Sequence, residues 1–182
     1  MKRLAKVMLL PAVLLPTVAL ALAVAPPTAA IAQTVKPVAV VSLASVEENL
    51  ADVAYITRIA GQEDVGKTAM LFGNALTAGI DKSRPGGMYV VPQAGDFHAV
   101  AFVPVSNLKL LLEVHKEQVG EPEDVGGNIL KIGMDRTAYV KEVGGWAFVA
   151  ESKEHLSNLP QDPAALLGDL PKTYNVAGRV LL

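Results

Sequence analysis

The sequence predicts an α+β protein: an antiparallel sheet of ββα units with helices mainly on one face, preceded by two helices and an N-terminal signal helix. Three observations lead to this prediction. They are a basic and then apolar N-terminus, two helical patterns that follow a β-rich run, and a short string that occurs twice beside hairpin signals. The 182 residues divide into a signal peptide, residues 1–32, and a single α+β domain, residues 33–182.

The N-terminal segment has the three parts of a secretory signal peptide. Basic residues come first, an uncharged stretch covers 7–25, and Ala30-Ile31-Ala32 offers small residues to a signal peptidase. An uncleaved membrane anchor is the alternative, because the apolar stretch approaches the ~20 residues that cross a bilayer. Pro11 and Pro16 interrupt that stretch as a helix, so we expect cleavage after Ala32 and a periplasmic or secreted location.

Cleavage leaves a mildly acidic domain without cysteine. Residues 33–182 keep all 18 acidic residues and 13 of the 16 basic ones, which gives a net charge of −5. Nucleic-acid binding rests on clustered basic residues, and no basic patch occurs in the sequence. The absence of cysteine excludes disulfides, thiolate metal sites and a cysteine nucleophile, so the core alone must stabilise the exported domain.

The domain is predicted to begin with a strand and two helices. A β-rich run over 35–43 precedes Ser45, which forms a capping box with Glu48 and starts a helix that ends at Gly61. A second helix is predicted over 64–78, where Gly79 ends it. Its apolar stripe consists of Val65, Ala69, Phe72 and Leu76.

Two ββα units are predicted next, at about 85–119 and 129–160. In the first, strands at 87–91 and 97–103 precede a helix that Ser106 caps. In the second, Gly144-Gly145 forms a two-residue hairpin turn between strands, and Ser152 starts the helix. The strands of the second unit are predicted at 129–132, 137–143 and 146–150.

The string Ala-Phe-Val-x-x-Ser occurs in both units, at 101–106 and 147–152. Because the order of elements repeats together with the residues, we interpret the two units as a duplication. A third, truncated unit is predicted from residue 172. Its strand at 174–182 would leave an open edge through which the protein self-associates.

One string matches the phosphate-loop pattern G-x-x-x-x-G-K-[ST], with Gly61, Gly66, Lys67 and Thr68 at the defining positions. Its context argues against a nucleotide site. A predicted helix precedes it instead of a strand, two acidic residues lie where phosphates would bind, and no strand ending in Asp follows to hold a metal ion. We therefore interpret the match as chance and predict no cofactor.

No catalytic or metal-binding residues are predicted. His98, His115 and His155 lack the spacing of zinc ligands, and His115 lies on the apolar stripe of its helix, where a structural role is expected. The acidic connector 121–128 lacks the ligand order of a calcium loop. No Gly-x-Ser-x-Gly string marks a hydrolase nucleophile, although Asp96 and His98 are two residues apart, a spacing that can place them on one strand face.

The segment 139–163 carries a family resemblance. Gly144-Gly145-Trp146-Ala147-Phe148-Val149, followed by a Ser-Lys-Glu helix and Leu-Pro-x-Asp-Pro, resembles a group of bacterial secreted signal-peptide proteins known only as a domain of unknown function, with repeated ββα-type modules. As an order of elements the resemblance covers most of 36–182. It implies export and this fold, and it brings no catalytic residues.

The function expected from these observations is an exported, non-enzymatic binding or structural module. Its expected partner is a cell-envelope protein, or a second copy bound through the C-terminal strand, and not nucleic acid. Membrane contact is expected only through the signal segment if it stays uncleaved. Two alternatives stay open: a phosphate-loop nucleotide-binding protein that uses 61–68, and an exported hydrolase with an unrecognised site. The secondary structure before Gly61 distinguishes the nucleotide-binding protein from the binding or structural module. A strand there favours nucleotide binding, and a helix argues against it.

Overall fold

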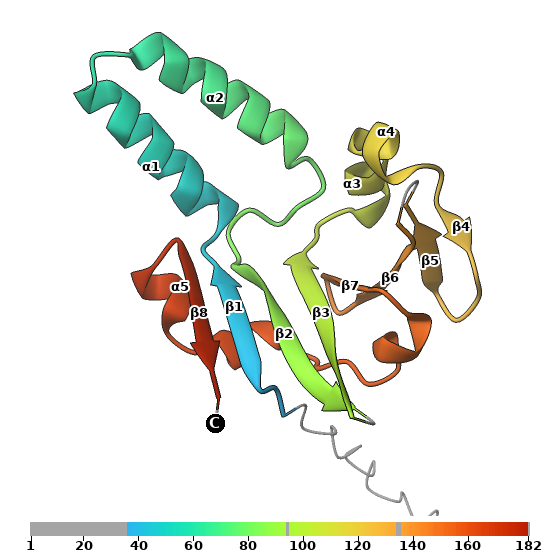
Figure 1. The fold of residues 1–182 in the computed structure, drawn as a ribbon. Coiled ribbons are helices and arrows are strands. Elements are labelled where there is room, and N and C mark those ends of the chain that lie inside the picture. The colour runs from blue at the N-terminus through green and yellow to red at the C-terminus, as the bar shows by residue number, and fades with distance from the viewer. Residues whose placement is uncertain (1–35, 94, 134–135, 182) are drawn as a thin grey trace, which may run out of the picture. The chain divides into compact units, whose positions relative to one another are not determined.

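The computed structural model describes residues 36–93, 95–133 and 136–181, so the predicted signal helix lies outside the described residues. Eight strands form one antiparallel sheet in the order β4-β5-β6-β7-β3-β2-β1-β8 (Figure 1). The strands are β1 Ala39–Leu43, β2 Gly86–Gln93, β3 Asp96–Pro104, β4 Glu123–Asp124, β5 Ile129–Ile132, β6 Ala138–Val143, β7 Trp146–Ala150 and β8 Val176–Val180. The helices are α1 Val46–Ile59, α2 Glu63–Leu76, α3 Leu108–Val114, α4 Lys116–Val119 and α5 Leu170–Thr173, with 3-10 helices η1 Lys153–Leu156 and η2 Pro163–Leu167. The predicted α+β class and antiparallel sheet are confirmed.

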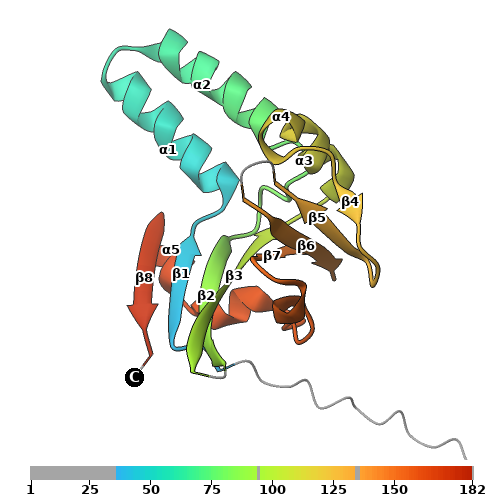
Figure 2. The same cartoon turned by 45° about the vertical axis from the view of Figure 1, so that its right-hand side comes forward.

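Helices α1 and α2 form an antiparallel hairpin between β1 and β2 (Figures 1 and 2). The predicted capping box starts α1: the Glu48 backbone N–H donates to Ser45 Oγ at 3.1 Å, and the Ser45 N–H donates to the Glu48 carboxylate at 3.2 Å. Gly61 lies in the turn with φ of 68°, a left-handed conformation that glycine adopts without strain. The segment before Gly61 is therefore a helix, as predicted.

The central ladder of the sheet joins the two predicted hairpins. Strands β2 and β3 form one hairpin and β6 and β7 the other, and β3 pairs with β7 so that Phe102 lies opposite Phe148. Gly144 and Gly145 have φ of 60° and 75°, which confirms the two-residue turn. Phe102 is the seventh residue of β3 and Phe148 the third of β7, so the two Ala-Phe-Val strings occupy different places in their hairpins.

Helices cover both faces of the sheet, which corrects the prediction of helices mainly on one face. Elements η1, η2 and α5 pack on the face that carries Phe102 and Phe148. On the opposite face, α3 and α4 pack over Val140 and Ala147. The reason is visible in β7, where Trp146–Ala150 is apolar at every position, so a sheet with side chains alternating between faces must bury both sides of this strand.

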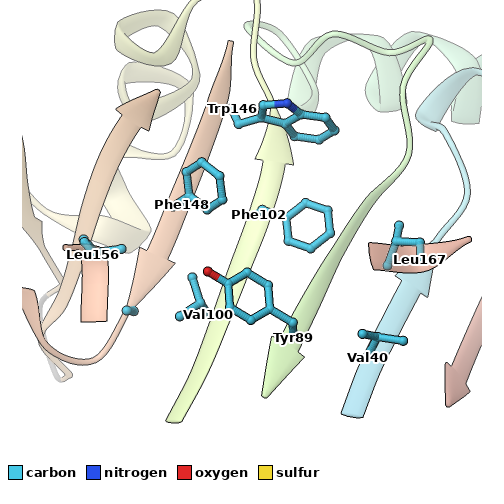
Figure 3. Packing of buried hydrophobic residues seen from close by; sticks show 9 residues of the cluster. Val40, Tyr89, Val100, Phe102, Trp146, Phe148, Leu156 and Leu167 are labelled. Carbon is cyan, nitrogen blue, oxygen red and sulfur yellow. The ribbon is translucent and has the colours of Figure 1, made fainter. Parts of the chain in front are cut away.

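The main core lies under η1 and η2 (Figure 3). Phe102 has no solvent exposure and meets the Trp146 ring edge to face, with ring centroids 5.6 Å apart. Tyr89 packs beside Phe102, and burial raises the pKa of its hydroxyl to about 12, so this side chain stays neutral. Leu156 from η1 and Leu167 from η2 close the cluster.

Two local predictions were wrong. Asn107, not Ser106, caps α3, because its Oδ1 accepts from the Leu110 N–H at 2.9 Å. The single predicted helix breaks at His115, which ends α3 and precedes α4.

The C-terminal strand is part of the same sheet. It forms β8 and pairs antiparallel with β1, with Arg179 opposite Val40. Because β1 already pairs with β2 on its other side, β8 is an edge strand of the sheet. Val176 and Val180 on this strand are largely exposed.

Replacing Phe102 with alanine should lower the free energy of unfolding by about 3–5 kcal/mol, because the side chain is fully buried among aromatic rings. Phe97→Ala is the matched control, since Phe97 lies on the same strand but is 70% exposed. Urea denaturation of the two purified variants measures the difference. Equal losses of stability would mean that the aromatic cluster does not form the core.

Candidate functional site

The phosphate-loop-like string lies in the hairpin of α1 and α2, and its side chains bond within their own helix. The Lys67 ammonium lies 3.0 Å from the Asp64 carboxylate, and both side chains are exposed. The Thr68 hydroxyl donates to the Asp64 carbonyl at 2.8 Å. A phosphate loop needs a strand before it and a lysine directed over the loop, whereas here a helix precedes Gly61 and Lys67 pairs with the preceding turn.

Gly66 has a packing role in this hairpin. It is the buried residue of α2, and a Cβ atom there would overlap Thr57 Oγ1 of α1. Gly73 repeats the arrangement one heptad later, where a Cβ would lie 2.5 Å from Leu50 Cδ2. Two glycines seven residues apart therefore let the helices approach closely, and this accounts for the second glycine of the motif.

Two of the histidines meet in space, which the sequence spacing did not indicate. His98 of β3 and His155 of η1 have ring centroids 3.9 Å apart. Desolvation and the neighbouring His98 hold the pKa of His155 below its ordinary value, while Glu154 and Glu151 oppose this shift. Within the described part of the chain, no three acidic or histidine side chains converge to hold a metal ion. The pair is thus a stacked contact between β3 and η1.

His115 has the structural position that its place on the apolar stripe predicts. Its side chain is partly buried, and Nε2 lies 2.9 Å from the Leu76 carbonyl at the end of α2. The contact connects the end of the helical hairpin to the junction of α3 and α4.

The acidic connector is used in local ion pairs. Glu121 lies 2.8 Å from Lys116, and Glu123 lies 3.1 Å from Lys131 across the β4–β5 ladder. Asp124 accepts the Gly126 N–H at 2.8 Å in a tight turn. These partners give the carboxylates a structural role in the turn.

The serine hydroxyls of the described residues do not form a nucleophile of the triad type. Ser42 is the fully buried one, and its Oγ has no hydrogen-bond partner. Ser152 caps η1 and contacts the Glu154 carboxylate, a hydrogen bond that lowers the pKa of Glu154. An activated serine needs a base within hydrogen-bond reach, and no serine hydroxyl of the described residues forms a hydrogen bond with a histidine.

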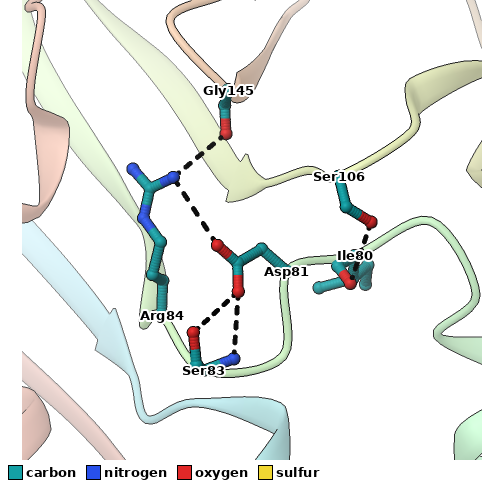
Figure 4. A network of polar contacts seen from close by, with 6 residues as sticks. All are labelled: Ile80, Asp81, Ser83, Arg84, Ser106 and Gly145. Carbon is teal, nitrogen blue, oxygen red and sulfur yellow. Dashed lines mark hydrogen bonds and ion pairs between the residues drawn. The ribbon is translucent and has the colours of Figure 1, made fainter.

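Arg84 organises a polar network that sequence reasoning missed (Figure 4). Its guanidinium carbon lies 3.9 Å from the centroid of the Trp146 ring, in a cation–π contact. The same group donates to the Gly145 carbonyl at 3.5 Å and lies 3.8 Å from the Asp81 carboxylate. Asp81 also accepts from the Ser83 N–H and hydroxyl. The network connects the segment before β2 to the turn between β6 and β7.

An apolar pocket of about 420 Å³ lies next to Arg84, over the face of β1, β2 and β3 that η1 and η2 do not cover. Its lining is Val41, Leu43, Ala44, Val46, Ile80, Arg84, Gly86, Gly87, Met88, Ala101, Phe102, Val103 and Pro104. Arg84 is the charged member of this set. Val41, Met88 and Ala101 are directly paired across three strands. The alternation of side chains along the strands could have placed them on one face of the sheet. It could not have predicted that no helix covers them.

Comparisons of the chain with protein-family models, with curated proteins and with solved structures found no match. None of the helices among the described residues combines the length and apolar character needed to cross a bilayer.

Gly66→Ala should destabilise the protein by about 1–3 kcal/mol, because the new methyl group overlaps Thr57 Oγ1. Adding Thr57→Ala should restore most of the lost stability, because it removes that atom.

Lys67→Ala should change the free energy of unfolding by less than about 0.5 kcal/mol, since the side chain is exposed. Denaturation curves of the four proteins give these values.

Titration of the unaltered protein with Mg-ATP completes this test. We expect no saturable binding at physiological concentrations. A dissociation constant in the micromolar range that Lys67→Ala abolishes would establish a phosphate loop instead.

The stability of the protein should fall between pH 7.5 and pH 5, in part because of His155. Its folded-state pKa is lower than the ordinary 6.5, so the unfolded chain binds the proton more readily. The stabilisation is complete above about pH 6.5 and is lost as the pH falls through the folded pKa. His155→Gln should flatten the pH dependence of the denaturation midpoint, and His115→Gln is the control. An unchanged slope in His155→Gln would contradict the stacked contact.

Proposed function

We propose that the protein is an exported, non-enzymatic binding or structural module that works outside the cytoplasm. The observation that carries this proposal is the apolar pocket over β1, β2 and β3. Ligand pockets are concave, mostly apolar and commonly about 300–1,000 Å³ in volume. A pocket of about 420 Å³ with one guanidinium at its side fits that description.

The chemistry of the lining favours an apolar ligand group. The strand residues contribute aliphatic side chains, and Gly86, which lies on the same face of β2 as Met88, leaves space there because it has no side chain. Arg84 lies beside the pocket, and its guanidinium is stacked on Trp146. This contact holds the guanidinium in place at the side of the pocket. We infer that an aliphatic or aromatic group of a partner occupies the pocket, and that no bond is made or broken there.

Export is supported by the sequence of the first 32 residues. The basic start, the uncharged stretch and Ala30-Ile31-Ala32 form the order that a signal peptidase reads. We therefore propose cleavage after Ala32 and a location in the periplasm or outside the cell. The partner is then a cell-envelope component or a second copy, and the free edge of β8 is one surface where a strand could add.

We also propose that residues 85–119 and 129–160 derive from one duplicated ββα unit, and that residue 172 begins a third such unit, whose strand is β8. The repeated Ala-Phe-Val-x-x-Ser string and the order of hairpin followed by helix support this. The different positions of Phe102 and Phe148 in their hairpins require that the strands changed length after the duplication.

Filling the pocket should abolish apolar binding. Ala101→Phe places a ring in the pocket, whereas Ala99→Phe places the same ring on the same face of β3 but outside the lining. With 1-anilinonaphthalene-8-sulfonate as a fluorescent apolar probe, we expect saturable binding to the unaltered protein and to Ala99→Phe, and loss of this binding in Ala101→Phe. Equal binding by both variants would rule out the pocket as the site.

The same preparation tests export. N-terminal sequencing of protein from the extracytoplasmic fraction of a bacterial host should begin at Gln33. A retained Met1 in the membrane fraction would establish an anchor.

A further inference from the structure

The helical hairpin carries an apolar surface that the rest of the described chain does not cover. In α1 and α2, the buried residue is Gly66, yet both helices carry large apolar side chains. The exposed fractions are 62% for Ile56, 55% for Val65, 60% for Phe72 and 53% for Leu76. Contiguous apolar patches of this kind on a soluble protein mark a surface that is covered in its working state.

These side chains lie on one face of the hairpin. The helices touch where Thr57 meets Gly66 and where Leu50 meets Gly73. Successive residues of a helix are about 100° apart, so the residue before each contact and the residue three after it lie on the same side of their helix. In an antiparallel pair of helices, these two sides belong to the same face of the pair. We call this the apolar hairpin face. Its members are Asn49, Val53, Ile56, Ala60, Val65, Ala69, Phe72 and Leu76.

The opposite face of the hairpin verifies this geometry. Residues three before or one after each contact should lie together there. One shallow hollow is indeed lined by Arg58 of α1 and Glu63 and Lys67 of α2, together with Ala54, Met70 and the contact pair Thr57 and Gly66. The hairpin is therefore amphipathic as a unit: charged residues lie on one face, none belongs to the apolar hairpin face, and Asp64 borders that face beside Val65, Ala69 and Phe72.

The spacing on the apolar hairpin face is that of a helix bundle. From Asn49 to Ala60, the residue that caps the C-terminus of α1, the members follow at intervals of four, three and four residues, and α2 repeats these intervals. This is the heptad a/d pattern, which packs against further helices. Each helix thus has two seams, one used inside the hairpin and one open, as helices of a four-helix bundle have.

We propose that the occupant of this face is a second copy of the same hairpin, so that two chains form a four-helix bundle. The face has no charged residue, so two copies meet without like-charge contacts even though the predicted mature chain is acidic. Large side chains such as Phe72 alternate with small ones such as Ala69, and a two-fold axis can place one against the other.

A lipid surface fits this face less well. Helices that bind anionic bilayers carry lysine and arginine on their polar side. Here α1 and α2 contain five acidic residues and two basic ones, Arg58 and Lys67. An anionic bilayer would repel this acidic hairpin, whereas the uncharged apolar hairpin face of a second copy would not.

The area of the apolar hairpin face determines how strongly two copies are expected to associate. Fourteen residues per helix give a length of about 21 Å, and two helices side by side are about 20 Å wide. Two such faces bury on the order of 1,000 Å² in total, at the low end of specific interfaces. The dimer should therefore be reversible, with a dissociation constant in the micromolar range.

The test uses the full chain as a bacterial host processes it, followed by sedimentation velocity from about 1 to 200 μM, a range that brackets such an affinity. Phe72→Glu and Ile56→Glu should each weaken dimerisation about 100-fold or more, because the two-fold places each charge in the interface twice. Leu71→Glu is the matched control: Leu71 neighbours Phe72 in α2 and is 70% exposed, but lies outside the apolar hairpin face. Circular dichroism confirms that each variant is folded.

Four results would overturn the proposal, three of them from the dimerisation measurements. The first is a monomer at every concentration, and the second is a dimer that Leu71→Glu weakens as much as Phe72→Glu does. The third is a dimer that survives Phe72→Glu but is lost in Val180→Pro, which would assign pairing to the edge of β8. Co-flotation of the unaltered protein, but not Phe72→Glu, with phosphatidylcholine vesicles would replace the second copy by a membrane. Ala101→Phe, which fills the pocket, should leave the dimer intact. A negative result for dimerisation is therefore independent of a negative result for ligand binding in the pocket.

Discussion

The pairing of β3 with β7 is the contact on which the rest of the structure depends. It joins two hairpins that are separate in sequence, and it places Phe102 opposite Phe148 with no exposure for either ring. Both strands are apolar on both sides, so this ladder must be covered from above and below. The coverings are η1 and η2 on one face and α3 on the other. Without the ladder, neither covering layer would have a continuous surface to pack on.

The covering stops short of β1 and β2 on the α3 side, and this produces the pocket. Arg84 marks the boundary, because its guanidinium stacks on Trp146 of the ladder while its backbone belongs to the segment that leads into β2. A buried aromatic ring thus fixes a cation at the rim of an apolar space. The same residue that closes the core also orients the charged group of the candidate site.

Local signals in the sequence predicted the elements well, because each depends on a few neighbouring residues. The Ser45 capping box, the Gly144-Gly145 turn and strands 129–132 and 146–150 are confirmed in place. What the sequence did not predict depends on contacts across many residues. The cover on both faces, the stack of His98 on His155 and the position of Arg84 over Trp146 each join segments that no short pattern relates. The duplication stays a proposal, since the strand registers neither require nor exclude it.

The second helix shows why an apolar stripe alone does not locate a core. Val65, Ala69, Phe72 and Leu76 have the spacing of a buried face, and the sequence indicates a helix correctly. Burial then depends on what lies opposite. Gly66 and Gly73 make the contact with α1 narrow, because the backbone of α2 lies against the side chains of Thr57 and Leu50 and adds no side chain of its own at these two points. A narrow seam uses a small part of each helix surface, so the stripe is left outside it. A hairpin closed by glycines is therefore built to keep its larger apolar face for another surface.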